Sequence, residues 1–94
     1  MTAVIDAQGF RAGLLRDGYT AAESSRPAGP ASEPHAHEFH AKAMVLEGSF
    51  TLTVGGTAAT YRPGEVFTMP AGTEHIEQPG PQGVRYIGGR KLTR

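Results

Sequence analysis

The sequence contains no cysteine among its 94 residues, and this absence excludes several kinds of site at once. Without thiols the chain can form no disulfide, no zinc–thiolate site and no cysteine nucleophile. Candidate metal ligands and catalytic groups must therefore be sought among the other side chains.

The sequence also lacks a net charge and a long apolar run, and its first residues do not have the pattern of a signal peptide. Nine basic and nine acidic residues cancel, which gives no global attraction to nucleic acid or to an anionic membrane. The one basic cluster, at Arg90, Lys91 and Arg94, is too small to change that. No apolar run approaches the roughly 18 residues of a membrane span, and residues 1–6 lack the basic start and apolar core of a signal peptide. We therefore expect a cytoplasmic protein that binds neither nucleic acid nor membrane.

Glycine and proline are abundant, with thirteen and seven residues, and such a composition disfavours long helices. The length allows a single domain, here taken as residues 1–94. The only helical pattern covers residues 7–18, with Asp6 placed as its N-cap and Gly18 as the glycine that ends it. An edge strand is expected over 19–26, so that residues 1–26 form an N-terminal helix and strand. The proline-rich residues 27–34 are expected to form a loop.

Residues 35–92 have the pattern of a β-rich core. Phe50, Leu52 and Val54 alternate with two threonines, and Gly55-Gly56 predicts a two-residue hairpin turn. Strands are expected over 41–47, 50–54, 57–61, 66–69, 74–78 and 84–88, with breaks at Gly48-Ser49 and at 79–83. With the edge strand this makes about seven short strands, which predicts an all-β fold of packed antiparallel sheets or a closed barrel.

Three of the four histidines, His35, His37 and His40, lie within six consecutive positions, and the fourth is His75. On an extended segment, residues i and i+2 point to the same face, so His35 and His37 could share one metal ion. His75 follows the turn at Pro70-Ala71-Gly72 and could supply a third ligand. The spacing alone also fits two solvated side chains, which is the commoner fate of a His-x-His pair.

The residues around these histidines resemble the two sequence motifs of the cupin superfamily. Four residues match the spacing of the first motif: Gly29, His35, His37 and Gly48. Four residues match the spacing of the second motif: Gly64, Pro70, Gly72 and His75. The resemblance implies a small single-domain cupin, that is, a jelly-roll barrel (double-stranded β-helix), here with a short N-terminal helix. It also implies a homodimer and a metal site formed by His35, His37 and His75.

Two positions depart from the family pattern. Ala41 stands where the family usually has a glutamate ligand, and Pro79 stands where it often has asparagine. A site of three histidines with open positions resembles that of the thiol dioxygenases in the superfamily, and it suits Fe, Mn, Ni or Zn. Glu77, on the same face as His75, is one candidate for a fourth ligand or for an acceptor behind the ligands. His40 is a second candidate if a bulge turns its side chain to that face. The alternative for both Glu77 and His40 is that each is an exposed polar side chain with no role in the site.

Several functions remain open at this point. The first is a metal-dependent, dioxygenase-like enzyme acting on a small organic substrate. Its candidate acids or bases, none singled out by spacing, are Tyr61, Tyr86, His40 and Glu77. The second function is a non-catalytic module that binds or senses a small ligand or a metal, and the third is a structural homodimer with adventitious metal. Ala41 and Ala43 predict room for a small ligand beside the metal, unless an aromatic side chain fills it.

Overall fold

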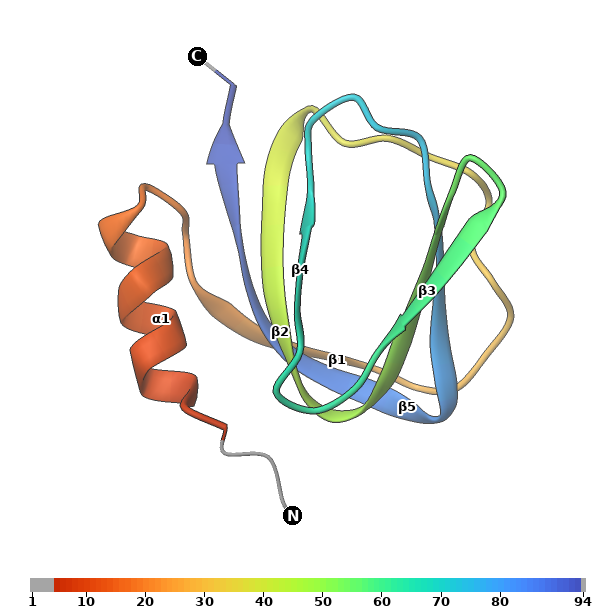
Figure 1. The fold of residues 1–94 in the computed structure, drawn as a ribbon, viewed down its shortest axis with the longest axis horizontal. Helices are drawn as coiled ribbons and strands as arrows, with labels where there is room; N and C mark the ends of the chain where they lie inside the picture. The colour runs from red at the N-terminus through yellow and green to blue at the C-terminus, as the bar shows by residue number, and fades with distance from the viewer. Residues whose placement is uncertain (1–4, 94) are drawn as a thin grey trace.

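Two long antiparallel strands, β2 (Phe39–Val54) and β5 (Ile76–Leu92), form the centre of the computed structural model, which describes residues 5–93. The described chain also contains three shorter strands and one helix: β1 (Ala22–Arg26), β3 (Thr57–Tyr61), β4 (Val66–Met69) and α1 (Ala7–Arg16). The strands curl into a small barrel, and α1 lies outside it (Figure 1). The predicted all-β fold with a short N-terminal helix is therefore confirmed.

All strand pairs are antiparallel, and β5 runs along nearly the whole length of β2. The sheet order is β1-β5-β2-β3, and β4 also pairs with β2. The β2–β5 register runs from Phe39 opposite Leu92 to Thr53 opposite Ile76. The other edge of β2 is shared by β4 near its start and β3 near its end. β2 therefore takes part in both halves of the barrel.

The structure corrects the two strand breaks that the sequence predicted. Gly48-Ser49 lies inside β2 and residues 79–83 lie inside β5, so residues 5–93 form five strands instead of about seven. β2 bends without ending, because register shifts on both sides of Gly48 interrupt its regular pairing with β5. Gly48 has a φ of 74°, which a glycine adopts without strain.

The helix begins where it was predicted and ends slightly earlier. The side chain of Asp6 accepts a hydrogen bond from the N–H of Gly9 over 2.9 Å, which confirms Asp6 as the N-cap. α1 ends at Arg16, and Gly18 follows it with a φ of 90°. The edge strand likewise begins at Ala22 and not at residue 19. No helix within residues 5–93 is long and apolar enough to cross a membrane.

Alternate residues of β2 are buried on opposite faces, which gives the protein two apolar clusters. The larger cluster lies inside the barrel and contains Ala43, Val45, Phe50, Leu52, Phe67, Met69 and Val84. The smaller cluster contains Met44, Leu46 and Ile87, and Ala7 and Phe10 of α1 pack against it. Because α1 covers the outer face, the inner face of β2 is the one that remains for a site.

Candidate metal centre

A short backbone bridge joins the segment before β2 to the segment before β5. These segments would lie at opposite ends of a flat ladder, but the curled strands bring them together (Figure 1). The N–H of His35 donates to the carbonyl of His75 over 3.0 Å, and the N–H of His75 donates to the carbonyl of His35 over 2.9 Å. The N–H of Gly72 donates to the carbonyl of His37 over 2.9 Å. The bridge therefore places the histidines of both segments at one point.

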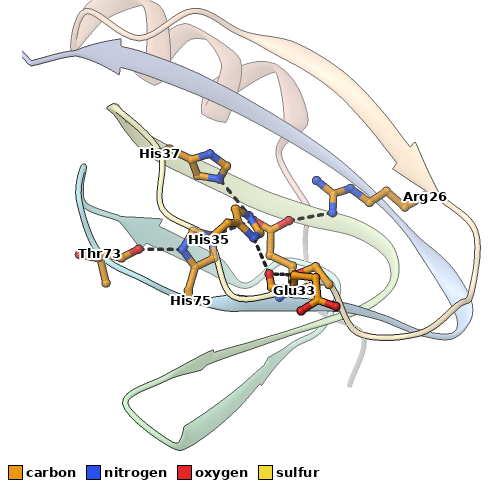
Figure 2. Close-up of polar contacts among 8 residues, drawn as sticks. Arg26, Glu33, His35, His37, Thr73 and His75 are labelled. Carbon is orange, nitrogen blue, oxygen red and sulfur yellow. Dashed lines mark hydrogen bonds and ion pairs between the residues drawn. The ribbon is translucent and has the colours of Figure 1, made fainter.

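Four side chains converge at this bridge: His35, His37, His75 and Glu77. Figure 2 shows the three imidazoles grouped together. One ligand atom from each residue lies within 4.8 Å of all the others. Oε2 of Glu77 lies 2.8 Å from Nε2 of His75, 3.4 Å from Nε2 of His35 and 3.5 Å from Nε2 of His37. His75 and Glu77 are buried and the other two are half-buried, and the set of nitrogen and oxygen donors could hold a divalent transition metal ion.

The outer ring nitrogens of two histidines are held by backbone carbonyls (Figure 2). Nδ1 of His35 lies 2.9 Å from the carbonyl oxygen of Glu33, and Nδ1 of His75 lies 2.9 Å from that of Thr73. A carbonyl oxygen only accepts, so each Nδ1 carries the proton, and Nε2 of the neutral ring presents a lone pair to the cluster. The ionised carboxylate of Glu77 also presents lone pairs. A cation, either a metal ion or a second proton on a ring, must lie between them, and for this reason the residues fit a metal.

The carboxyl group of Glu77 is held in its ionised state by its neighbours. Burial alone would raise its pKa, but hydrogen bonds with His75 and Arg26, the charge of Arg26 and a hydrogen bond with His37 lower the pKa to about 2. Nη1 of Arg26 donates to Oε1 over 2.7 Å, so Oε2 is left to face the imidazoles. Glu77 is therefore ionised at neutral pH, which is the state in which a carboxylate binds metal.

Replacing Arg26 with glutamine should raise the pKa of Glu77 in the metal-free protein, because the hydrogen bond and the charge that lower it are lost. In the wild type the pKa of about 2 lies below the ordinary value of 4.5, so this stabilisation is present above pH 4.5 and is lost as the pH falls toward 2. We expect Arg26→Gln to cost about 1 kcal/mol above pH 4.5, since the guanidinium is 43% exposed and solvent weakens the pair. The stabilities of the two proteins should converge near pH 2.

NMR titration of the Glu77 carboxyl carbon measures this pKa, and urea unfolding at each pH measures the stability. Arg16→Gln is the matched control, because Arg16 pairs with an exposed carboxylate, that of Asp17, far from the cluster. An unchanged Glu77 pKa in Arg26→Gln would contradict the role given to the ion pair.

The structure does not bring His40 to the cluster, although the sequence left it as an alternative fourth ligand. Its Nδ1 accepts a hydrogen bond from the N–H of Ala71 over 3.1 Å. β2 pairs regularly from Phe39 onward, and its first register shift comes only after Val45. Because no bulge reorients His40, its side chain keeps the face opposite to that of Ala41.

A cavity of about 210 Å³ adjoins the cluster on the inner face of the barrel. Ala41 and Ala43 line it, as their parity predicted. The aromatic residues that could have filled it line its walls instead: Phe39, Phe67 and Tyr86. His37 and Glu77 belong both to the cluster and to the lining of the cavity. The structure therefore contains room for a small molecule beside the candidate ligands.

The two tyrosines considered as acid or base lie in different places. Tyr86 lines the cavity, whereas the ring of Tyr61 packs against the apolar core, 5.2 Å from that of Phe67.

The sequence did not indicate Arg26 as a site residue, because it lies 51 residues from Glu77. One local signal could have found it: Ala22, Ser24 and Arg26 alternate on one face of the edge strand, and this face lines the cavity.

Known proteins with similar sequence or structure agree with this architecture. The family model of the cupin domain matches residues 23–85. An RmlC-like cupin from Shewanella frigidimarina NCIMB 400 superposes with a TM-score of 0.67 and 25% identity, covering 82% of this chain and 68% of that one. The polyketide cyclase RemF from Streptomyces resistomycificus superposes with a TM-score of 0.67 and 29% identity, over 81% of this chain and 56% of that one.

A third structure resembles the whole chain. This protein of unknown function, from Rhizobium leguminosarum bv. viciae 3841, has a TM-score of 0.73 and covers 99% of both chains. Its identity of 17% supports a likeness of fold alone. No curated protein sequence matches the chain.

Proposed function

The chain belongs to the cupin domain family, and on that premise we propose that it binds a divalent transition metal ion, Fe, Mn, Ni or Zn. The proposed ligands are His35, His37, His75 and Glu77, and a small organic molecule would occupy the adjoining cavity. The observation that carries this proposal is the convergence of three Nε2 atoms on one carboxylate oxygen. With Nδ1 protons held outward at two of these rings, their Nε2 atoms are the nitrogens left to face a metal ion.

The more specific function is a dioxygenase-like reaction on a small organic substrate. The bound ion would supply Lewis acidity and, if it is iron, redox chemistry. Phe39, Phe50 and Phe67 give the space beside the ligands a partly apolar wall, against which an organic substrate could pack. Oη of Tyr86 is the hydroxyl that could hold or move a proton there.

A non-catalytic cupin that binds or senses a small ligand is the second candidate. Glu77 is the only carboxylate among the described residues that line the cavity, and it is engaged by three imidazoles and Arg26. With a pKa of about 2, it is a poor general base at neutral pH. This shortage of proton acceptors favours binding over turnover.

Elemental analysis of protein produced without a histidine tag tests the metal. We expect about one equivalent of metal in the wild type, a loss in the double variant His35→Ala/His37→Ala, and retention in His40→Ala. Oxygen uptake with small thiols, diketones and catechols, after reconstitution with each metal, then separates the two candidates. No metal in the wild type, either as purified or after reconstitution, would refute the proposal. Bound metal without oxygen uptake in any combination would select the non-catalytic module.

We also propose that the protein forms a homodimer. β1 lies at the edge of the sheet, and all its residues are exposed, which leaves a strand edge available to a second copy. Light scattering during size-exclusion chromatography measures the mass in solution. A mass of twice the chain supports the dimer, and the mass of one chain contradicts it.

A further inference from the structure

The cavity beside the candidate metal centre carries more positive than negative charge. Within the described chain its lining includes three basic residues, Arg26, Lys42 and Arg90, and one acidic residue, Glu77. The charge of Glu77 is already matched by Arg26, whose Nη1 lies 2.7 Å from Oε1. A divalent ion at the four ligands would add further positive charge. The cavity is therefore suited to an anionic occupant.

Arg90 is the guanidinium at this cavity that has no acidic partner within residues 5–93. Its central carbon lies 4.6 Å from the centroid of the Phe39 ring, and Phe39 stacks on His37 with centroids 4.7 Å apart. The guanidinium of Arg90 thus lies one aromatic ring away from a candidate metal ligand. Lys42 belongs to the opposite face of β2 from Ala41, so Arg90 is the better placed of the two.

The backbone of Arg90 is fixed on the side of β5 that faces the segment before β1. The N–H of Arg90 donates to Oγ1 of Thr20 over 3.0 Å, and the carbonyl of Arg90 accepts from the N–H of Thr20 over 2.9 Å. A fixed backbone and a ring beneath the guanidinium restrict where its planar donor face can point. The planar guanidinium can donate two parallel N–H hydrogen bonds, and this geometry matches a carboxylate better than any neutral group.

The cavity is small, and aromatic side chains form part of its wall. Phe50 and Tyr86 stack with centroids 5.8 Å apart and an interplanar angle of 11°, and both line the space. Gly88 and Gly89 line it without side chains. Its volume of about 210 Å³ is below the roughly 300 Å³ at the lower end of drug-sized pockets. The occupant therefore has a compact apolar body as well as its charge.

We propose that the cavity binds a small organic carboxylate, with the carboxylate group held by the guanidinium of Arg90 and the apolar body against Phe39, Phe50 and Tyr86. This inference rests on the proposed function, because it names the chemical class of the ligand for the same metal centre. Arg26 contributes charge to the cavity, while its own hydrogen-bonded partner is Glu77.

The test uses the complete chain loaded with Co²⁺, and the probes are benzoate and benzamide, which have nearly the same shape and differ in charge. The visible absorption of Co²⁺ first measures metal binding, and titration calorimetry then measures the affinity for each probe. We expect benzoate to bind at least about 10-fold more tightly than benzamide, because its carboxylate pairs with the guanidinium. Arg90→Gln should abolish this preference, and Arg16→Gln, on α1 and outside the cavity, should retain it.

Arg90→Lys is a second variant, which keeps the charge and removes the planar fork; we expect a preference between those of the wild type and Arg90→Gln. The Co²⁺ spectrum of each variant reports whether the centre is still formed. Equal affinities for the two probes in the wild type would overturn the inference while leaving the metal site in place. A benzoate preference that survives in Arg90→Gln would also overturn it, because the carboxylate would then be bound by the metal or by Arg26. If the wild type binds no Co²⁺, the proposed function itself fails, and this inference fails with it.

Discussion

Excess Zn²⁺ is expected to raise the midpoint of thermal unfolding of the metal-free protein by about 10–20 °C. An ion that binds the folded chain and not the unfolded one stabilises it by about 2.7 kcal/mol at a free concentration of roughly 100 times the Kd. Each kcal/mol shifts the midpoint of a domain of this size by about 4–8 °C. The donor set exists only in the folded chain, because the bridge between His35 and His75 joins segments that are distant in sequence. Scanning calorimetry after treatment with a chelator measures the shift.

A double variant and a control test whether the rise in unfolding midpoint comes from Zn²⁺ at the four candidate ligands. The double variant His35→Ala/His37→Ala removes two half-buried metal ligands and should lose nearly the whole shift relative to its own metal-free midpoint, which the loss of the His37 contact with Glu77 lowers. His40→Ala is the matched control: this histidine is close in sequence, and its Nδ1 is occupied by the N–H of Ala71. An undiminished shift in the double variant, or a shift that is lost in His40→Ala, would show that Zn²⁺ binds elsewhere.

The histidines of the cluster could be predicted because they fall in two short segments with recognisable spacing. Alternation along an extended chain places His35 with His37, and it also places Glu77 with His75. The choice between Glu77 and His40 could not be made from the sequence, because it depends on where β2 carries its bulges. The structure places the register shifts beyond Val45, so His40 keeps its regular face.

The lengths of the strands were harder to predict than their existence. Gly48-Ser49 and residues 79–83 have the composition of turns, yet each lies within a strand that continues through it. Pro79 is tolerated there because it lies opposite Phe50, beside a register shift where the pairing is already irregular. Arg26 could not be assigned to Glu77: alternation along β1 shows only which face Arg26 shares, and its partner depends on the pairing of β1 with β5.

The glycine at position 48 explains in physical terms why the first motif ends in glycine. It has a φ of 74°, and a Cβ built there would overlap the backbone carbonyl of Gly83 on β5. Any other residue would therefore meet two separate penalties. The left-handed conformation costs a non-glycine residue about 1–2 kcal/mol, and moving β5 away to relieve the overlap costs about 1–3 kcal/mol more.

Gly48→Ala should accordingly lower the free energy of unfolding by about 2–5 kcal/mol in urea titrations. Gly55→Ala is the matched control, because Gly55 also has a positive φ, of 57°, but a Cβ there would meet nothing within 4 Å. It should cost only about 1–2 kcal/mol, the conformational part alone. Equal losses of unfolding free energy in the two variants would mean that β5 moves away from residue 48 without cost. The close approach of Gly48 to Gly83 would then not stabilise the bend in β2. If Gly48→Ala lowers the free energy of unfolding by more than Gly55→Ala does, it should also reduce the rise in unfolding midpoint that Zn²⁺ causes. The reason is that the bend in β2 helps to bring the segment of His35 back to His75.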